Sequence, residues 1–266
     1  MVIKMKQKRT INILWTGGLD STCRVAQLSQ MDNIIIQPYY IIDPGRGSIK
    51  YEINAMKNIA AIIRNHPKTT AELKDTILVK LNDIKQYPEI TKSYNILREK
   101  YRLGGQYDFL ARYAKQENIA LEVGLECSPR SKAYITVTSE SKDLLEEIEV
   151  DELLINKETS SRDLINVFEN LRIGKRIWTM SKLEEVEYLK SIGLESIILK
   201  THFCHTPIFG LTCGQCNPCK DALNEGMAWR VSKLGRALGL LRKIFYYAPK
   251  KIICKVISFL SHNTGC

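Results

Sequence analysis

The first 64 residues alternate between short apolar runs and longer segments whose apolar residues recur at helical spacing. The runs Ile11–Trp15 and Ile34–Ile42 have the length and the apolar content of buried strands. Helices are expected at Ser21–Gln30 and Ile49–Arg64, where the apolar residues fall on one helical face. This alternation predicts an α/β fold: an open, mostly parallel sheet with helices on both faces.

The rest of the chain gives weaker signals. Residues 66–102 are polar and helix-compatible, which predicts a helical insertion without a strong strand. Ser181 is expected to cap a helix that runs to about Ser191, because Glu184 three residues later completes a capping box. The remaining expected elements are a helix at Gln106–Gln116, a strand at Leu121–Leu125 and strand candidates at Tyr134–Thr138, Ile177–Met180 and Ile197–Leu199.

The composition is that of an ordinary globular protein. The chain has 266 residues, of which 44% are hydrophobic and 26% charged. These values exclude a mainly disordered, collagenous or coiled-coil chain. We expect three regions: an α/β domain over 1–200, a four-cysteine zinc-binding segment over 201–226, and a basic amphipathic tail over 227–266.

The positive charge is concentrated near the C-terminus. The chain carries a net charge of +10, and the segment after Glu225 has eight Lys and Arg residues and no acidic residue. The remainder is left with only +2, so a nucleic-acid surface across the whole body is not implied. For the tail, three interpretations stay open: a helix packed on the body or on a homodimer partner, a peripheral membrane helix, or, least favoured, a nucleic-acid contact.

The chain is expected to be cytoplasmic. It lacks an uncharged apolar stretch long enough to span a membrane, and its basic N-terminus lacks an apolar run of signal-peptide length. In that compartment the eight cysteines are expected to be thiols or metal ligands, not disulfides.

A glycine turn follows the first expected strand and carries the first candidate chemistry. Thr16–Thr22 reads Thr-Gly-Gly-Leu-Asp-Ser-Thr, between a strand and a helix. Two glycines let successive N–H groups converge on an anion, and the helix N-terminus behind them adds further donors. The turn thus predicts a phosphate cradle without the lysine of a Walker loop. The alternative is a plain strand-to-helix turn, with Asp20 or Ser21 as an ordinary N-cap.

Four cysteines near the C-terminus have the spacing of a metal site. Cys204, Cys213, Cys216 and Cys219 follow the pattern Cys-x8-Cys-x2-Cys-x2-Cys. Two Cys-x2-Cys steps let thiolates converge on one ion, which predicts a closed structural zinc site. The alternatives are a redox-active pair and unliganded core thiols.

The glycine turn closely resembles the signature of the PP-loop ATP pyrophosphatases, with Thr16 in the place of the usual serine. Together with the cysteine spacing, it makes the chain resemble the 7-cyano-7-deazaguanine synthase family of queuosine biosynthesis. Segments 43–46, 104–111 and 180–184 are also similar to that family. The family's Arg-Asn pair is absent after Gly105, and Ala222 stands where an arginine is usual, which indicates a diverged paralogue.

The resemblance implies an adenine-nucleotide alpha-hydrolase-like fold and an ATP-dependent C–N ligase. Such an enzyme uses ATP and Mg²⁺ to adenylate a carboxylate or amide of a small-molecule acceptor, releasing AMP and pyrophosphate. In the family the acceptor is a 7-deazaguanine acid, which reacts with ammonia and becomes a nitrile. Two alternatives are a PP-loop enzyme that modifies tRNA, protein or glycan, and a non-catalytic, zinc-stabilised nucleotide-binding module.

The candidate site residues follow from the turn and from the resemblance. Arg46 and Lys182 are expected to add positive charge near the phosphates; otherwise they are a solvated loop arginine and an exposed helix lysine. Asp43 is expected to bind a metal or the ribose, or else to start a turn before Pro44. The expected catalytic residues are Asp20, Ser21, Arg46 and Lys182, and the expected nucleotide-binding residues are Leu14, Trp15, Thr16, Gly17, Gly18, Leu19, Asp20, Ser21, Thr22 and Asp43.

Overall fold

The computed structural model describes residues 8–128 and 130–244. These residues divide into two units, which we describe separately. The first unit runs up to Gly45 and continues from Ile49 to His202, and the second comprises Arg46–Ser48 and continues from Phe203. The C-terminal part of the expected tail, including the apolar residues within 252–260, lies outside the described residues.

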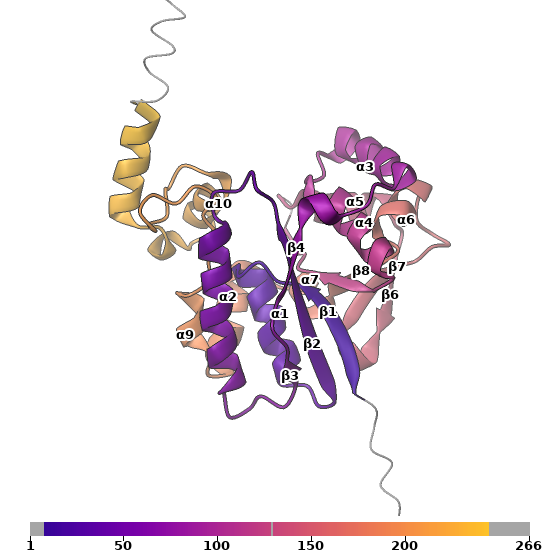
Figure 1. The fold of residues 1–266 in the computed structure, drawn as a ribbon, viewed down its shortest axis with the longest axis horizontal. Coiled ribbons are helices and arrows are strands. Elements are labelled where there is room, and N and C mark those ends of the chain that lie inside the picture. Colours follow the sequence, from indigo (N-terminus) through magenta and orange to yellow (C-terminus); the bar gives the residue numbers. More distant parts are fainter. Residues whose placement is uncertain (1–7, 129, 245–266) are drawn as a thin grey trace, which may run out of the picture. The chain divides into compact units, whose positions relative to one another are not determined.

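The first unit contains all the named strands and most of the named helices (Figure 1). The strands are β1 (Arg9–Leu14), β2 (Ile34–Ile42), β3 (Glu72–Leu73), β4 (Ile77–Lys80), β5 (Leu121–Val123), β6 (Leu144–Glu147), β7 (Glu152–Ile155) and β8 (Leu171–Gly174). The helices are α1 (Leu19–Ser29), α2 (Ile49–Arg64), α3 (Pro88–Tyr101), α4 (Gln106–Glu117), α5 (Lys132–Glu140), α6 (Arg162–Phe168), α7 (Lys175–Thr179), α8 (Lys182–Ser191) and α9 (Glu195–Ile198). The second unit holds α10 (Asn217–Asn224) and a helical segment over 233–244.

Among the described helices, none combines the length and the apolar character needed to cross a bilayer.

The sheet is mostly parallel, and β1 lies inside it. The strand order is β3-β2-β1-β5-β8-β7-β6, and β4 also pairs with β2. Strands β1, β2, β3, β4, β5 and β8 pair in parallel, whereas β6–β7 and β7–β8 are antiparallel. The chain proceeds from β1 to β2 on one side and later returns to place β5 on the other side. The order of strands therefore reverses between β1 and β5, which is where open α/β sheets bind ligands.

Helices cover both faces of the sheet, as the apolar pattern predicts. Ile13 and Leu14 are consecutive in β1 and both buried, and consecutive strand residues point to opposite faces. Leu14 belongs to a core shared with α3, α4, α5 and α6, whereas α1 contacts α2, α7 and α8 (Figure 1). The α/β class and the mostly parallel sheet are confirmed.

Three expected strands are helices instead. Tyr134–Thr138 lies in α5, Ile177–Met180 overlaps α7, and Ile197–Leu199 overlaps α9. In α5, the hydroxyl of Thr136 donates to the carbonyl of Lys132 at 2.6 Å, and that of Thr138 donates to the carbonyl of Tyr134 at 2.9 Å. These bonds let β-branched threonines join a helix despite their strand preference. The strand in this part of the chain is β8, which ends at Gly174, before the expected strand begins.

The segment 66–102, expected to be helical, ends in α3 but begins with two short strands. β3 pairs with Ile35 and Ile36, and β4 pairs with Tyr39–Ile42, so both lie on the same edge of β2. All four residues of β4 are half-buried or exposed, and its apolar residues Ile77 and Leu78 are among the exposed ones. A short edge strand of this kind has too few buried residues to produce a clear alternating pattern.

A buried ionic network lies beneath α1. The guanidinium of Arg24 donates to both carboxylate oxygens of Glu122, each at 2.8 Å, and the Arg24 and Glu122 side chains are 1% and 0% exposed. Glu152 on β7 is buried next to this pair. Burial, together with the nearby Glu122 charge, raises the pKa of Glu152 to about 8. Glu152 is therefore protonated in the folded protein at neutral pH.

We expect Glu152→Gln to remove a pH-dependent loss of stability. Because the folded pKa is raised from 4.5 to about 8, Glu152 stabilises the fold fully below about pH 4.5, and this contribution is lost as pH rises through 8. Glutamine mimics the protonated acid, so at pH 9 the variant gains about 1–3 kcal/mol over wild type and at pH 5 almost nothing. Urea unfolding at both pH values measures this, with Glu99→Gln on exposed α3 as control. A gain that is equal at both pH values would contradict the assignment.

Candidate functional site

The glycine turn leaves the start of α1 without a side-chain cap. Gly17 has φ +68°, a backbone conformation that other residues rarely adopt, and a Cβ there would lie 3.0 Å from the carbonyl oxygen of Glu52 on α2. Both the backbone conformation and the lack of space therefore disfavour a larger residue. Gly18 is the N-cap of α1, and no side chain caps it. The first-turn N–H groups, from Leu19 to Ser21, therefore remain available to an anion. Neither Asp20 nor Ser21 is a plain N-cap.

The hydroxyl groups of the turn have two different environments. The backbone N–H of Thr16 donates to Oγ of Ser21 at 3.4 Å, and the two hydroxyl oxygens lie 3.5 Å apart. Thr22 is fully buried, and its Oγ1 accepts from the indole N–H of Trp15 at 3.0 Å. The Thr16 and Ser21 hydroxyls thus lie close together in the part-buried side of the turn, whereas the Thr22–Trp15 bond fixes its buried side. Leu14 and Leu19 are buried as well.

Lys182 lies next to the turn although it is 160 residues away in sequence. Its ammonium forms ion pairs with Oδ1 of Asp20 and with Oε2 of Glu126, the latter at 2.6 Å. Lys182 is the first residue of α8, whose start is held by the expected capping box between Ser181 and Glu184. The three charged side chains are 18–28% exposed, so they are partly withdrawn from solvent and open on one side.

Glu126 of this cluster and the neighbouring Gly124 are not identified as site residues from the sequence. Glu126 follows β5, and Gly124 precedes it; a Cβ on Gly124 would lie 3.4 Å from the backbone nitrogen of Ser21. Gly124 therefore lets the chain after β5 approach the start of α1 closely. An acidic residue after an apolar run was the available signal, but the sequence does not reveal that β5 pairs with β1.

The charges explain what this cluster attracts. Two carboxylates and one ammonium have a net charge of −1, so the cluster repels a bare polyanion and can accept a cation. The cluster lies at the carboxyl ends of β1 and β5, where the strand order reverses. The backbone N–H groups at the start of α1 and the Lys182 ammonium lie at this edge, where Asp20 pairs with Lys182.

Asp43 and Arg46 behave differently. Oδ1 of Asp43 accepts from the backbone N–H of Gly45 at 3.0 Å, which is the turn-starting arrangement. Arg46 belongs to the second unit, so its place beside the phosphates stays a prediction.

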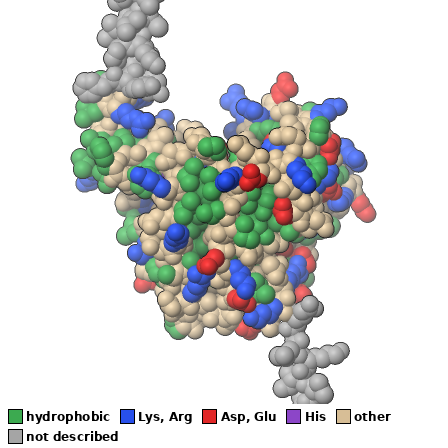
Figure 2. Space-filling model, in the orientation of Figure 1, with side chains coloured by type: hydrophobic (Ala, Val, Ile, Leu, Met, Phe, Trp, Pro, Cys, Tyr) green, Lys and Arg blue, Asp and Glu red, His purple; other side chains and the backbone are tan. Residues whose placement is uncertain are grey.

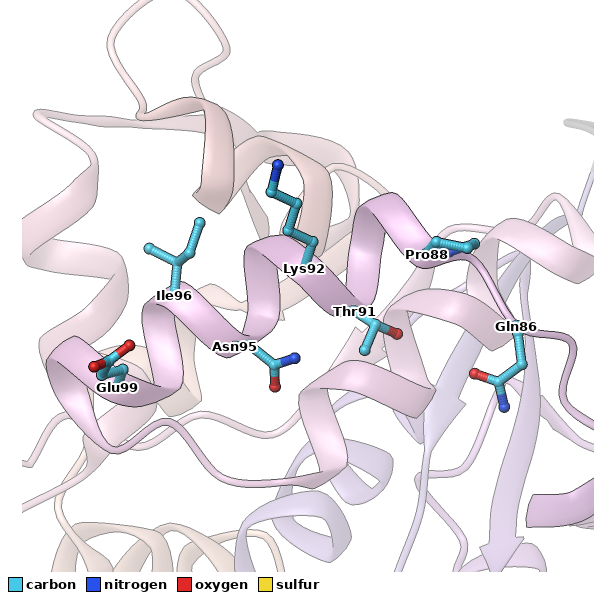
Figure 3. A pocket seen from close by; sticks show the side chains of 7 residues that line it. All are labelled: Gln86, Pro88, Thr91, Lys92, Asn95, Ile96 and Glu99. Carbon is cyan, nitrogen blue, oxygen red and sulfur yellow. The ribbon is translucent and has the colours of Figure 1, made fainter.

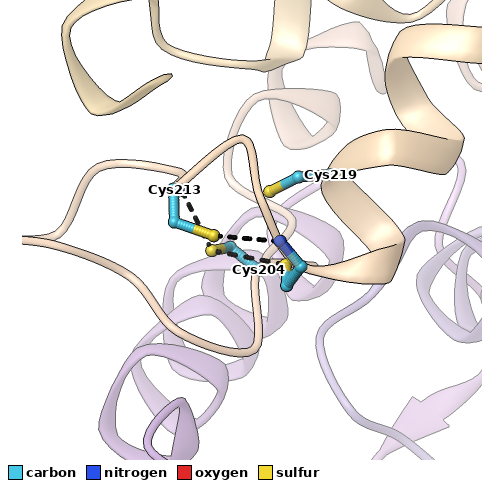
Figure 4. A group of neighbouring side chains, drawn as sticks. Cys204, Cys213 and Cys219 are labelled. Carbon is cyan, nitrogen blue, oxygen red and sulfur yellow. Dashed lines mark hydrogen bonds between the residues drawn. The ribbon is translucent and has the colours of Figure 1, made fainter. Parts of the chain in front are cut away.

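The four cysteines of the second unit converge as their spacing predicts. The sulfur atoms of Cys204, Cys213, Cys216 and Cys219 all lie within 4.8 Å of one another, and Figure 4 shows three of them close together. Three of the cysteines are buried and Cys216 is half-buried. Four sulfur ligands at this separation can hold a metal ion such as zinc, because thiolates suit a tetrahedral structural site.

Local backbone geometry positions the cysteines. Ile208 and Leu211 pair across a two-residue turn in which Phe209 and Gly210 both have positive φ. After this turn the N–H of Cys213 donates to Sγ of Cys204 at 3.2 Å, and that of Cys216 donates to Sγ of Cys213 at 3.4 Å. Such N–H donors stabilise thiolates, which are the form that binds metal.

The thiols also perturb one another. Interaction with Cys216 raises the pKa of Cys204 to about 12, whereas interaction with Cys204 lowers the pKa of Cys216 below its ordinary range, as when a Cys204 thiol faces a Cys216 thiolate. In the absence of a cation, four sulfurs so close together cannot all ionise. A redox pair requires only two cysteines, so the convergence of four favours the metal interpretation.

A separate hollow lies along α3. It has a volume of about 500 Å³ and is lined by side chains between Gln86 and Glu99 (Figure 3). In Figure 3, Lys92 and Ile96 lie on one side of the helix and Asn95 on the other. The lining has one lysine and one glutamate and no cluster of titratable groups, so this hollow lacks the features of a catalytic site.

Comparison with known proteins adds no relatives. No family model matches the chain, and a search of curated proteins finds no match. The features of the chain that bear on function are the glycine turn, the Lys182 cluster and the four cysteines.

Proposed function

We propose that the first unit binds Mg·ATP and transfers its adenylyl group to an oxygen of a carboxylate or amide acceptor, releasing pyrophosphate. The observation that carries the proposal is the uncapped start of α1 behind Gly17 and Gly18, with the Lys182 ammonium beside it. Both lie where the strand order reverses. The resemblance of the turn to the PP-loop signature supports the same activity.

The proposed chemistry begins with attack of an acceptor carboxylate oxygen on the α-phosphorus of ATP. The bond to the β-phosphate oxygen breaks, and pyrophosphate leaves with the electron pair. Ammonia then attacks the acyl carbon, loses a proton and expels AMP, which gives an amide. In the nitrile-forming version, the amide oxygen attacks the α-phosphorus of a second ATP, pyrophosphate leaves and one N–H proton is lost. Elimination of AMP with loss of the other N–H proton then leaves the nitrile.

The residues of the cluster have distinct roles in this proposal. The N–H groups of Leu19–Ser21 hold the β- and γ-phosphate oxygens, where charge accumulates as pyrophosphate leaves. Lys182 neutralises the same charge, and its bonds to Asp20 and Glu126 fix its position before ATP arrives. Asp20 would hold a magnesium ion, and that ion would supply further charge neutralisation at the phosphates.

The cysteine site has a structural role in this proposal. Four thiolates complete the coordination of zinc, so no position remains for a substrate. We therefore assign the adenylation chemistry to the first unit and the metal to the folding of the second. Among acceptors, 7-carboxy-7-deazaguanine is the first to test, because of the family resemblance; tRNA, protein or glycan acceptors are the alternative.

The direct test measures AMP and pyrophosphate after incubation of the full chain with ATP, Mg²⁺, ammonium and a panel of acids. We expect AMP only with a competent acceptor, whose mass changes as amide or nitrile. Lys182→Ala should lower the rate about 10²-fold, because it removes one fixed charge from the developing pyrophosphate.

The control for Lys182→Ala is Lys92→Ala, an exposed lysine of the hollow on α3, which should turn over at the wild-type rate. An acceptor-dependent release of AMP that Lys182→Ala leaves unchanged would refute the role of the cluster. Tight ATP binding without AMP, under all acceptors, would instead favour the non-catalytic module.

A further inference from the structure

The helical segment 233–244 of the second unit packs through glycine. Gly235 and Gly239 are its buried residues, one turn apart. A Cβ on Gly235 would lie 2.2 Å from the carbonyl oxygen of Thr212, and a Cβ on Gly239 would lie 2.1 Å from that of Cys213. The helix backbone therefore lies directly on the chain that carries the cysteine site, and no side chain intervenes.

The opposite side of this helix is apolar and exposed. The exposed fractions are 63% for Leu234, 51% for Leu240, 47% for Leu241 and 49% for Ile244. At 100° per residue these positions lie away from Gly235 and Gly239. One interpretation of the tail is a helix packed on the body or on a homodimer partner, with its basic side outward. Within residues 233–244 the buried residues are the two glycines, whereas these apolar residues are exposed.

Four basic residues accompany the apolar ones: by helical position Lys233 lies among the exposed apolar residues, whereas Arg242 and Lys243 lie toward the buried glycines. Lys233, Arg236, Arg242 and Lys243 belong to the same helix, and the sequence has no acidic residue after Glu225. Arg242 and Lys243 also line a cavity of about 370 Å³ with Lys220 of α10. Figure 2 shows basic side chains beside hydrophobic ones at the helix that is drawn in yellow in Figure 1.

We propose that the face formed by Leu234, Leu240, Leu241 and Ile244 docks on the surface of an anionic lipid bilayer. A helix with exposed apolar residues and several exposed cations can insert at the boundary between headgroups and acyl chains, and Lys233, Arg236, Arg242 and Lys243 are all exposed to attract acidic headgroups. A second copy of the chain is a poorer occupant, because it would bring two such cationic segments together. Nucleic acid would satisfy the cations but would leave the leucines in water.

Sequence beyond the helix has the same character. Residues 245–260 combine aromatic residues, three lysines and a run of isoleucine and valine. Because this stretch can contribute to lipid binding by itself, the test must act on the described helix. Substitutions at Leu234 and Leu241 meet this need, since both side chains are exposed and neither supports the fold of the second unit.

The test is co-sedimentation of the full chain with phosphatidylcholine vesicles, with or without about 30% phosphatidylglycerol. We expect binding to the anionic vesicles that is at least about 10-fold stronger than to neutral ones and that weakens in high salt. The double variant L234Q/L241Q should lose at least about 10-fold in this binding. L145Q, which changes a similarly exposed leucine on β6, is the matched control.

Three results would overturn the proposal. The first is the absence of vesicle binding, and the second is binding that L234Q/L241Q leaves intact, which would assign it to other residues. The third is a wild-type dimer that L234Q/L241Q dissociates, measured by light scattering, which would assign the face to a second copy. Retained binding in Asp20→Asn would show that docking and the proposed adenylation are separate properties.

Discussion

Asp20→Asn is expected to abolish AMP formation, with a loss of about 10³-fold or more, while the fold stays intact. The carboxylate of Asp20 is the only anion in the first turn of α1, and it contacts Lys182. Asparagine keeps the shape but removes the charge that pairs with the Lys182 ammonium and that, in the proposed function, would hold magnesium. The loss should therefore appear mainly in kcat, because the affected interactions strengthen as pyrophosphate leaves.

The control for Asp20→Asn is Asp83→Asn, at an exposed position of the first unit. Both variants should have wild-type circular dichroism and the wild-type unfolding midpoint, since Asp20 is not a cap of α1. Substantial AMP formation by Asp20→Asn would contradict the assignment of the turn to the phosphates. So would an equal loss in Asp83→Asn.

Cys219→Ser is expected to have the largest effect on stability. The Cys219 side chain is fully buried among the other three sulfurs. Structural zinc in a four-ligand site contributes on the order of 10 kcal/mol to the fold that it holds. Loss of one ligand should therefore lower zinc affinity at least about 10²-fold and expose the second unit to protease. Metal analysis and limited proteolysis, with and without chelator, measure both effects.

The matched control is Cys127→Ser, because Cys127 is exposed and lies outside the cluster. It should retain both zinc and protease resistance. The sheet of the first unit should resist protease in all three proteins, because its core does not include the cysteines. Zinc retention by Cys219→Ser, or a purified wild-type chain without metal, would argue for unliganded thiols.

The sequence predicts the first half of the sheet well because its apolar runs are long. The bounds of β2 and α2 agree with expectation to the residue, since Ile34–Ile42 and Ile49–Arg64 have clear strand and helix patterns. The antiparallel end of the sheet, β6 and β7, has no such signal. Glu146 and Glu147 of β6 are charged, and a short strand with few buried residues lacks the alternation that identifies it.

The sequence identifies candidate chemistry where it is local, and of the two local motifs the cysteine convergence is confirmed whereas the phosphate role of the glycine turn stays a prediction. The glycine turn and the cysteine spacing are each contained in a few consecutive residues, and the four sulfurs do converge. Lys182 could be proposed only by resemblance, and Glu126 was missed. Their meeting with Asp20 depends on the pairing of β1 with β5, a contact between residues more than 100 positions apart that apolar periodicity cannot report.

The glycine contacts of the segment 233–244 link the cysteine site to the surface of the protein. Gly239 lies on the carbonyl of Cys213, so the backbone that presents one sulfur to a metal is also the platform on which the helix rests. Loss of a metal from the four sulfurs would disturb that platform and loosen the attachment of the helix to the second unit. If the helix docks on lipid as proposed, metal occupancy would then modulate how well the exposed leucines are presented to the bilayer.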